Sequence, residues 1–331
     1  METPRRTLET MRFHLRRALA PLGLTTLGLA AAGGTGGPPP VDAFAVYDAA
    51  ARLLRTHYAG PRMGEVDRLL AGERAGLVRR CAGQARCPEF HGRAAVNAVL
   101  AALGDGHTRP LWNVPLHPAP PPTALDPRLR PTLRWEGQVA VIGLPEWFEV
   151  GMGAAFREAV GRAAARGATG LVVDLRDNPG GVLDECLAAA QGLAGDRVNL
   201  IGVGRSGAAI YDWRTTPQAQ AARAWPRWTG PLTLLVSPDT ASCGELLAYW
   251  GQQAGGTVVG LPTRGLLNTL TRDFALPGPS VLRLTAARAT PDGRVPLPER
   301  VEPDLRAGPE LADILAGRDP VLEAALEALR R

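Results

Sequence analysis

Residues 168–192, ATGLVVDLRDNPGGVLDECLAAAQG, decide the fold class of this chain. The apolar run 170–173 ends in charged residues and in the turn Asn-Pro-Gly-Gly at 178–181, and a segment with helical spacing follows. An apolar run bounded by turn residues predicts a buried strand, and adjacent glycines permit backbone angles that other residues resist. We therefore expect a strand, a tight turn and a helix whose first N–H groups favour negative charge. An ordinary strand-to-helix turn explains these residues equally well.

Similar patterns recur on both sides of this unit. Apolar runs predict strands at 139–144, 199–202, 232–236, 257–260 and 281–284. Helical spacing is found at 41–59, 66–82, 92–103 and 152–166, and again after Asp319. Strands that alternate with helices predict an α/β core. We expect a helical domain at 41–109, a proline-rich connection at 110–131, the core at 132–315 and a C-terminal helix at 316–331.

The first 40 residues have the composition of an export signal. Arginines precede an apolar segment, residues 18–32, which ends in Ala-Ala-Ala and so offers a cleavage site. The segment is shorter than the ~20 residues of a membrane-spanning helix. We expect a signal peptide at 1–32, a linker at 33–40, and a protein exported to the periplasm, the cell envelope or the medium. An uncleaved N-terminal anchor is the alternative.

The charge of the chain comes from an unusual composition. The 331 residues carry a formal charge of +5, and all 37 basic residues are arginine, because the sequence contains no lysine. The arginines are scattered and form no stripe or aromatic-basic motif, so no nucleic-acid interface is predicted.

Cys81 and Cys87 flank a short loop between two predicted helices. In an exported protein this spacing favours a disulfide, with two free thiols as the alternative. A zinc site is disfavoured, because only His91 is near and no second cysteine pair follows. We predict neither a metal nor a cofactor.

The segment 174–181, DLRDNPGG, resembles the signature of the C-terminal (tail-specific) processing peptidases, although Asp177 replaces the usual glycine. That family includes the tricorn protease core and the modules of the interphotoreceptor retinoid-binding protein. The resemblance covers roughly residue 44 to the C-terminus and implies a mixed core like those of ClpP and crotonase. Many members carry a PDZ domain before the core, but the connection at 110–131 is too short for one.

Ser242 begins a predicted helix directly after a strand and a polar turn. On physical grounds it is an N-cap serine, with Glu245 completing a capping box. The resemblance instead implies that Ser242 is the nucleophile of the family's Ser-x-x-Glu segment. Ser237 is the rival, but it lies on the strand side of the turn. Cys243 is rejected as a nucleophile, although a bond between Cys243 and Cys186 is an open alternative.

A serine nucleophile needs a base. The processing peptidases use a lysine about 25 residues after the serine, a distance implied by the resemblance that falls here at Leu266 or Leu267. A chain without lysine excludes that dyad, and Arg264 stays protonated. His107, in Gly-Asp-Gly-His-Thr, resembles the histidine base of the tricorn-like branch, and an imidazole suits proton transfer at neutral pH.

The third member of the site is expected near the end of the core. The segment 292–304 resembles a family segment from which a glutamate orients the histidine, so Glu299 is the first choice and Glu302 the second. Tricorn has a serine before its histidine where this chain has Gly106, so Asp105 is a further candidate.

The resulting hypothesis is an exported serine endopeptidase that cleaves peptides or unfolded protein tails through an acyl-enzyme. Its catalytic residues are Ser242, His107 and Glu299, and its oxyanion donors are the N–H groups of Gly180, Gly181 and Cys243. The alternative is a catalytically inactive protein that binds apolar ligands or peptides on the same scaffold. The oligomeric state is left open.

Overall fold

The computed structural model of the chain describes residues 41–116 and 125–330. The predicted signal peptide and linker lie outside these residues. Within them, no helix has the length and apolar character that crossing a bilayer requires.

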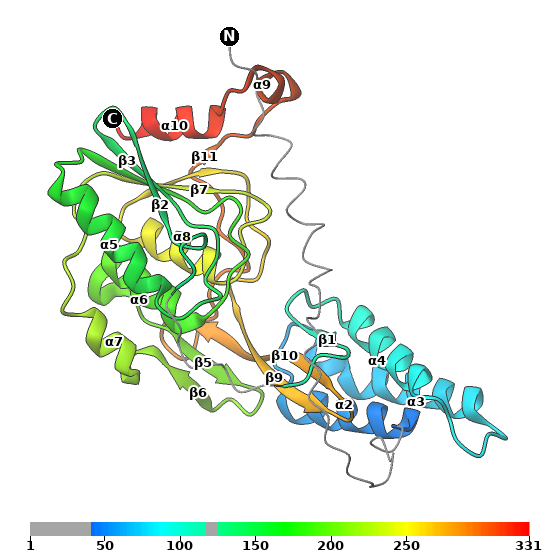
Figure 1. Cartoon of the computed structure of the whole chain (residues 1–331). Coiled ribbons are helices and arrows are strands. Elements are labelled where there is room, and N and C mark those ends of the chain that lie inside the picture. The colour runs from blue at the N-terminus through cyan, green and yellow to red at the C-terminus, as the bar shows by residue number, and fades with distance from the viewer. Residues whose placement is uncertain (1–40, 117–124, 331) are drawn as a thin grey trace, which may run out of the picture. The chain divides into compact units, whose positions relative to one another are not determined.

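Three helices open the described part of the chain: α2 (Ala43–His57), α3 (Val66–Cys81) and α4 (Glu89–Leu103). The Asp42 carboxylate accepts the Phe44 N–H at the start of α2, and Gly104 ends α4 with a φ of 62°. Their apolar faces share a core with leucines 276, 282 and 284. These leucines belong to β9 (Thr269–Leu276) and β10 (Ser280–Thr290), two strands that lie beside the helices (Figure 1). A disulfide joins Cys81 to Cys87 across the connection between α3 and α4.

The larger of two sheets has six strands in the order β11-β8-β7-β4-β3-β2. Its strands are β2 (Thr132–Glu136), β3 (Val139–Gly143), β4 (Gly170–Asp174), β7 (Leu232–Val236), β8 (Thr257–Gly260) and β11 (Leu305–Arg306). All neighbours are parallel except β2 and β3. β4 is buried at 170–173, as expected of a parallel strand covered on both faces.

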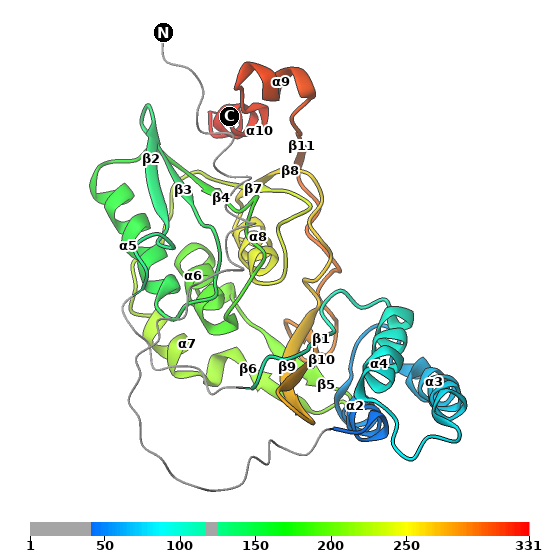
Figure 2. The ribbon, with the colours of Figure 1, turned by 45° about the vertical axis from the view of Figure 1, so that its right-hand side comes forward.

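Alternate residues of these strands enter two different cores. Leu171 and Val173 of β4 face α5 (Met152–Ala165), α6 (Leu183–Ala194) and α8 (Cys243–Gln253). Val172 faces the opposite side, where α10 (Pro320–Ala328) covers the sheet through Val321, Leu322 and Ala325 (Figure 2).

The second sheet is antiparallel, and the sequence predicted parts of only two of its strands, at 199–202 and 281–284. It contains β1 (Arg109–Leu111), β5 (Ile201–Gly204), β6 (Ala209–Asp212), β9 (Thr269–Leu276) and β10 (Ser280–Thr290). The sequence predicted only 281–284 of β10 and nothing of β9, because polar residues interrupt the apolar pattern of 269–276. The shorter helices are α7 (Pro217–Ala222) and α9 (Leu311–Ala316).

The predicted fold class, a mixed α/β core preceded by helices, is confirmed. β4 and β7 are parallel neighbours, with Asp174 opposite Leu235. Their carboxyl ends therefore meet at one edge of the sheet, and the turns 175–181 and 237–242 lie there together. In open α/β sheets this edge is where ligands bind.

Candidate active site

Asn178 holds the glycine turn in place. Its buried side chain donates to the Leu144 carbonyl at 3.0 Å and accepts the Gly180 N–H at 3.0 Å. Its own carbonyl accepts the Ala241 N–H at 2.9 Å. One residue thus fixes the turn after β4 and joins it to the turn that carries Ser242.

Ser242 has a backbone conformation that is rare for a residue with a side chain. Its φ of 52° lies in the left-handed region, which among the described non-glycine residues is shared only with Asn113. Such strain costs about 1–3 kcal/mol and clusters at functional sites. Because α8 begins at the next residue, the Ser242 hydroxyl stands at a helix N-terminus.

The glycine turn lies directly against Ser242. A Cβ built on Gly180 would stand 2.8 Å from the Ser242 Cβ and 3.1 Å from the Cys243 nitrogen. The Gly180 N–H already donates to Asn178. Within residues 41–116 and 125–330, the N–H groups of Gly181 and Cys243 have no hydrogen-bond acceptor. Of the three expected oxyanion donors, these two are therefore the open ones.

A second disulfide fastens this region. Cys243, next to Ser242, is joined to Cys186 of α6, and both residues are buried. Because α6 follows the glycine turn, the bond ties together the two helices that leave the sheet edge.

Glu245 links the start of α8 to a distant loop. Its fully buried carboxylate accepts the N–H groups of Ser242, Gly265 and Leu266 at 2.7, 2.9 and 2.9 Å. The Thr263 hydroxyl donates to it at 2.6 Å. Burial raises the pKa of this carboxyl, and the four hydrogen bonds oppose that rise.

His107 is buried in the loop that follows α4. Its Nδ1 lies 2.7 Å from the Thr269 hydroxyl, and its backbone N–H donates to the Asp105 carboxylate at 3.0 Å. Burial lowers the pKa of His107 to about 4, although the Asp105 charge acts in the opposite direction. The imidazole is therefore neutral at physiological pH.

The loop 263–269 contacts the surroundings of both candidate catalytic residues. Gly106 rests against Leu266, whose Cδ2 atom would be 3.2 Å from an added Cβ. Leu266 also shares a Glu245 oxygen with the Ser242 N–H. The structure therefore connects the His107 loop to the Ser242 turn through one side chain and one carboxylate.

Glu299, the expected acidic partner of His107, has an ion pair of its own. Glu299 is exposed and its carboxylate faces Arg300 at 3.4 Å. The group that contacts His107 Nδ1 is the Thr269 hydroxyl. Glu302 pairs with Arg306. The role of Glu299 remains a prediction, whereas no local sequence signal pointed to Thr269, which lies 162 residues from His107.

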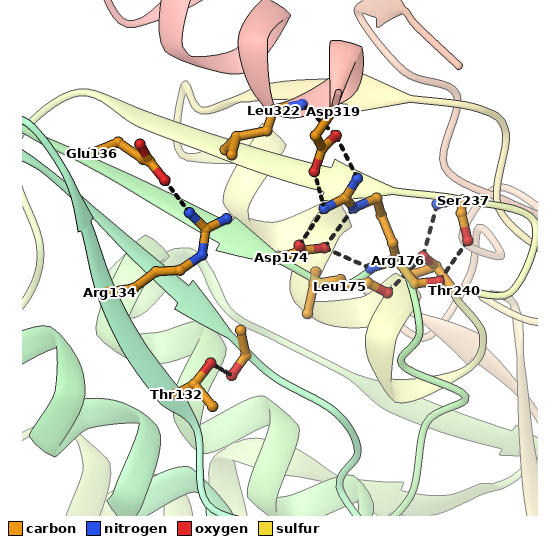
Figure 3. Close-up of polar contacts among 11 residues, drawn as sticks. Thr132, Arg134, Glu136, Asp174, Leu175, Arg176, Ser237, Thr240, Asp319 and Leu322 are labelled. Atoms are coloured by element: carbon orange, nitrogen blue, oxygen red, sulfur yellow. Dashed lines mark hydrogen bonds and ion pairs between the residues drawn. The ribbon is translucent and has the colours of Figure 1, made fainter. Parts of the chain in front are cut away.

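Ser237, the rival nucleophile, is committed to holding its turn. Its hydroxyl donates to the Arg176 carbonyl at 2.5 Å (Figure 3). The same hydroxyl accepts the Asp239 N–H at 3.0 Å. The Arg176 guanidinium in turn binds the carboxylates of Asp174 and Asp319, which fastens α10 to the end of β4.

No group of three or more histidine, cysteine or carboxylate side chains in the described part of the chain is arranged to hold a metal ion. The chemistry that these residues offer is that of a hydroxyl, a neutral imidazole and two free N–H groups.

Comparison with known proteins adds a family and a fold. The sequence model of peptidase family S41 matches residues 138–307. No curated protein sequence matches the chain.

Several solved structures are similar to it. A candidate peptidase from Parabacteroides merdae is 17% identical with a TM-score of 0.59, over 87% of this chain and 97% of that one. A lipoprotein from Streptococcus agalactiae is 14% identical with a TM-score of 0.58, over 92% and 100%. A photosystem II D1 C-terminal processing protease is 25% identical with a TM-score of 0.43, over 58% and 46%. The first two share the fold of this chain.

Proposed function

This chain belongs to peptidase family S41 and is a serine-type peptidase, and we propose that Ser242 is its nucleophile and His107 its general base. The conformation of Ser242 carries the proposal. A strained serine begins a helix, lies against the glycine turn and has two unpaired N–H groups beside it. Acyl transfer requires N–H donors for the oxyanion beside the attacking hydroxyl, and backbone strain clusters at active sites.

His107 fits the base because it is neutral and oriented. When Nδ1 carries the proton, its N–H donates to the Thr269 hydroxyl and Nε2 keeps a free lone pair. Burial lowers the pKa of His107 to about 4, so the imidazole stays unprotonated until the pH falls to that value. We therefore expect kcat/KM to decrease on acidification with a midpoint near pH 4 rather than near pH 6.5.

The reaction then follows the usual two steps of acyl transfer. His107 takes the Ser242 proton as the oxygen attacks a peptide carbonyl, and the N–H groups of Gly181 and Cys243 bind the oxyanion. Protonated His107 delivers its proton to the leaving amine, and the neutral ring then activates water to release the acyl group. We propose that the enzyme is exported and that its substrates are peptides or unfolded protein tails.

Labelling by a fluorophosphonate tests this assignment. We expect the wild type and Ser237→Ala to be labelled, Ser242→Ala to be unlabelled, and His107→Gln to be labelled at least 100-fold more slowly. Labelling that persists in Ser242→Ala would overturn the nucleophile. A folded wild type that neither labels nor cleaves an unfolded protein mixture, as read by mass spectrometry, would instead indicate a binding scaffold.

A further inference from the structure

Glu245 makes more contacts than a helix cap needs. A capping box requires one bond from this side chain to the N-cap N–H, and the bond to Ser242 supplies it. The other three bonds go to Thr263, Gly265 and Leu266, which lie 18 to 21 residues further along the chain. Those residues belong to the loop between β8 and β9, so this carboxylate joins two separate parts of the site.

The two oxygens have distinct partners. Oε2 accepts the N–H groups of Ser242 and Leu266, and Oε1 accepts the Thr263 hydroxyl and the Gly265 N–H. Leu266 touches Gly106, next to His107, and the same loop leads into Thr269, which contacts the imidazole. The Glu245 carboxylate therefore helps to fix both the position of Ser242 and the position of the loop that contacts His107.

Burying the Glu245 carboxylate costs free energy of desolvation. A buried carboxylate loses its hydration, and no ion pair involving Glu245 exists within residues 41–116 and 125–330 to offset that loss. Four hydrogen bonds to an ionised acceptor replace the water. A simple N-cap at the surface would need none of this, which indicates a purpose beyond the helix start.

We propose that Glu245 is a positioning residue for the peptidase reaction, holding the Ser242 turn and the loop 263–269 in register so that Ser242 and His107 meet. The proposal rests on the assignment of these two residues above. Glu245 contacts neither the Ser242 hydroxyl nor the imidazole, and it acts on them through the Ser242 backbone and the loop 263–269. Its loss therefore lowers kcat rather than substrate binding. A misplacement of about 1 Å between reacting groups can lower a rate by about 10²-fold.

Glu245→Gln is the first variant to measure. Its single oxygen can serve one pair of donors, and its amide group then points its own N–H bonds at the other pair. We expect kcat to fall about 100-fold with KM changed less than threefold, and the fluorophosphonate labelling rate to fall in parallel. Glu158→Gln, an exposed glutamate on α5, is the matched control and keeps wild-type kcat.

Thr263 supplies the second readout if Glu245→Gln does not fold. Thr263→Val removes one donor and leaves the carboxylate, and we expect kcat to fall about tenfold with KM unchanged. Thr263→Ser restores the hydroxyl and with it the wild-type kcat. Wild-type kcat in Glu245→Gln, or in Thr263→Val when Glu245→Gln is unfolded, would overturn the proposal.

Ser242→Ala separates this result from the proposed function. If that variant loses activity while Glu245→Gln keeps it, the nucleophile stands and the positioning role is rejected. If Ser242→Ala keeps activity, the catalytic assignment fails, and the positioning role fails with it.

Discussion

Ser242 carries a conformational cost that its function would explain. An alanine or serine at a φ of 52° is strained, whereas glycine adopts this region freely. Two hydrogen bonds hold the turn in this conformation, because the Ser242 N–H donates to the Glu245 carboxylate and the Ala241 N–H donates to the Asn178 carbonyl.

Two substitutions at Ser242 measure that strain. Both Ser242→Gly and Ser242→Ala remove the hydroxyl, but only glycine relieves the backbone. We expect the free energy of unfolding of Ser242→Gly to exceed that of Ser242→Ala by about 1 kcal/mol in urea titrations. Equal stabilities would mean that the residue is not strained.

The burial of His107 predicts a dependence of stability on pH. Its pKa falls from an ordinary value of 6.5 to about 4 on folding, so the unfolded chain binds the proton more readily. The neutral imidazole contributes about 3 kcal/mol to the free energy of unfolding. This contribution is complete above pH 6.5 and is lost as the pH falls from 6.5 to 4.

Urea unfolding at pH 7, 5 and 4 checks this expectation. His107→Gln should flatten the loss of stability between pH 6.5 and 4, while His91→Gln, a histidine remote from the site, should leave the wild-type slope. An unchanged slope in His107→Gln would contradict the burial of the imidazole as the cause.

At the scale of elements, the site depends on two helices that start at the same sheet edge. α6 follows the glycine turn, α8 follows Ser242, and the bond from Cys186 to Cys243 joins them. The other disulfide, between Cys81 and Cys87, lies in the connection between α3 and α4.

Removing each disulfide separately distinguishes their roles. The two bonds close loops with separations of 57 and 6 residues, for which the chain-entropy model gives about 4 and about 2 kcal/mol. We expect Cys186→Ala/Cys243→Ala to lose more stability than Cys81→Ala/Cys87→Ala in unfolding titrations. The labelling rate should fall only in the former, and an equal fall in both would argue against a local effect on the Ser242 turn.

Across the whole molecule, the site joins parts that belong to two cores. His107 follows α4, which packs in the core of the N-terminal helices, and Ser242 lies in the turn between β7 and α8, which pack in the core on one face of the large sheet. Thr108 helps to fix the histidine loop, because its hydroxyl donates to Asp105 at 2.7 Å and accepts the Thr285 N–H of β10 at 3.0 Å.

Thr108→Val tests this connection. The change leaves buried partners unsatisfied, and we expect a loss of about 1–3 kcal/mol in stability together with a fall of at least tenfold in kcat. Thr290→Val removes the hydroxyl of another buried threonine, which lies at the end of β10, five residues after Thr285. It should cost similar stability and keep kcat, whereas a matching fall in kcat would indicate general loosening.

Local sequence was sufficient for the features that depend on neighbours. The strand, turn and helix of 170–194 follow from apolar spacing and from two glycines, and the absence of lysine excludes a Ser–Lys dyad by composition alone. The resemblance to the processing peptidases pointed to Ser242 and His107, whose catalytic roles remain proposals. β9 was missed, because its polar residues hide the pattern.

Contacts between distant segments could not be read from spacing. The pairing of His107 with Thr269, the use of the Gly180 N–H by Asn178, and the reach of Glu245 to Leu266 all depend on how loops pack after the strands have assembled. Hydrogen-bonding groups of the same kind occur throughout the sequence, and only the folded chain selects which of them meet. Turn and helix signals act over a few residues, whereas the shape of this site is set by the packing of two cores.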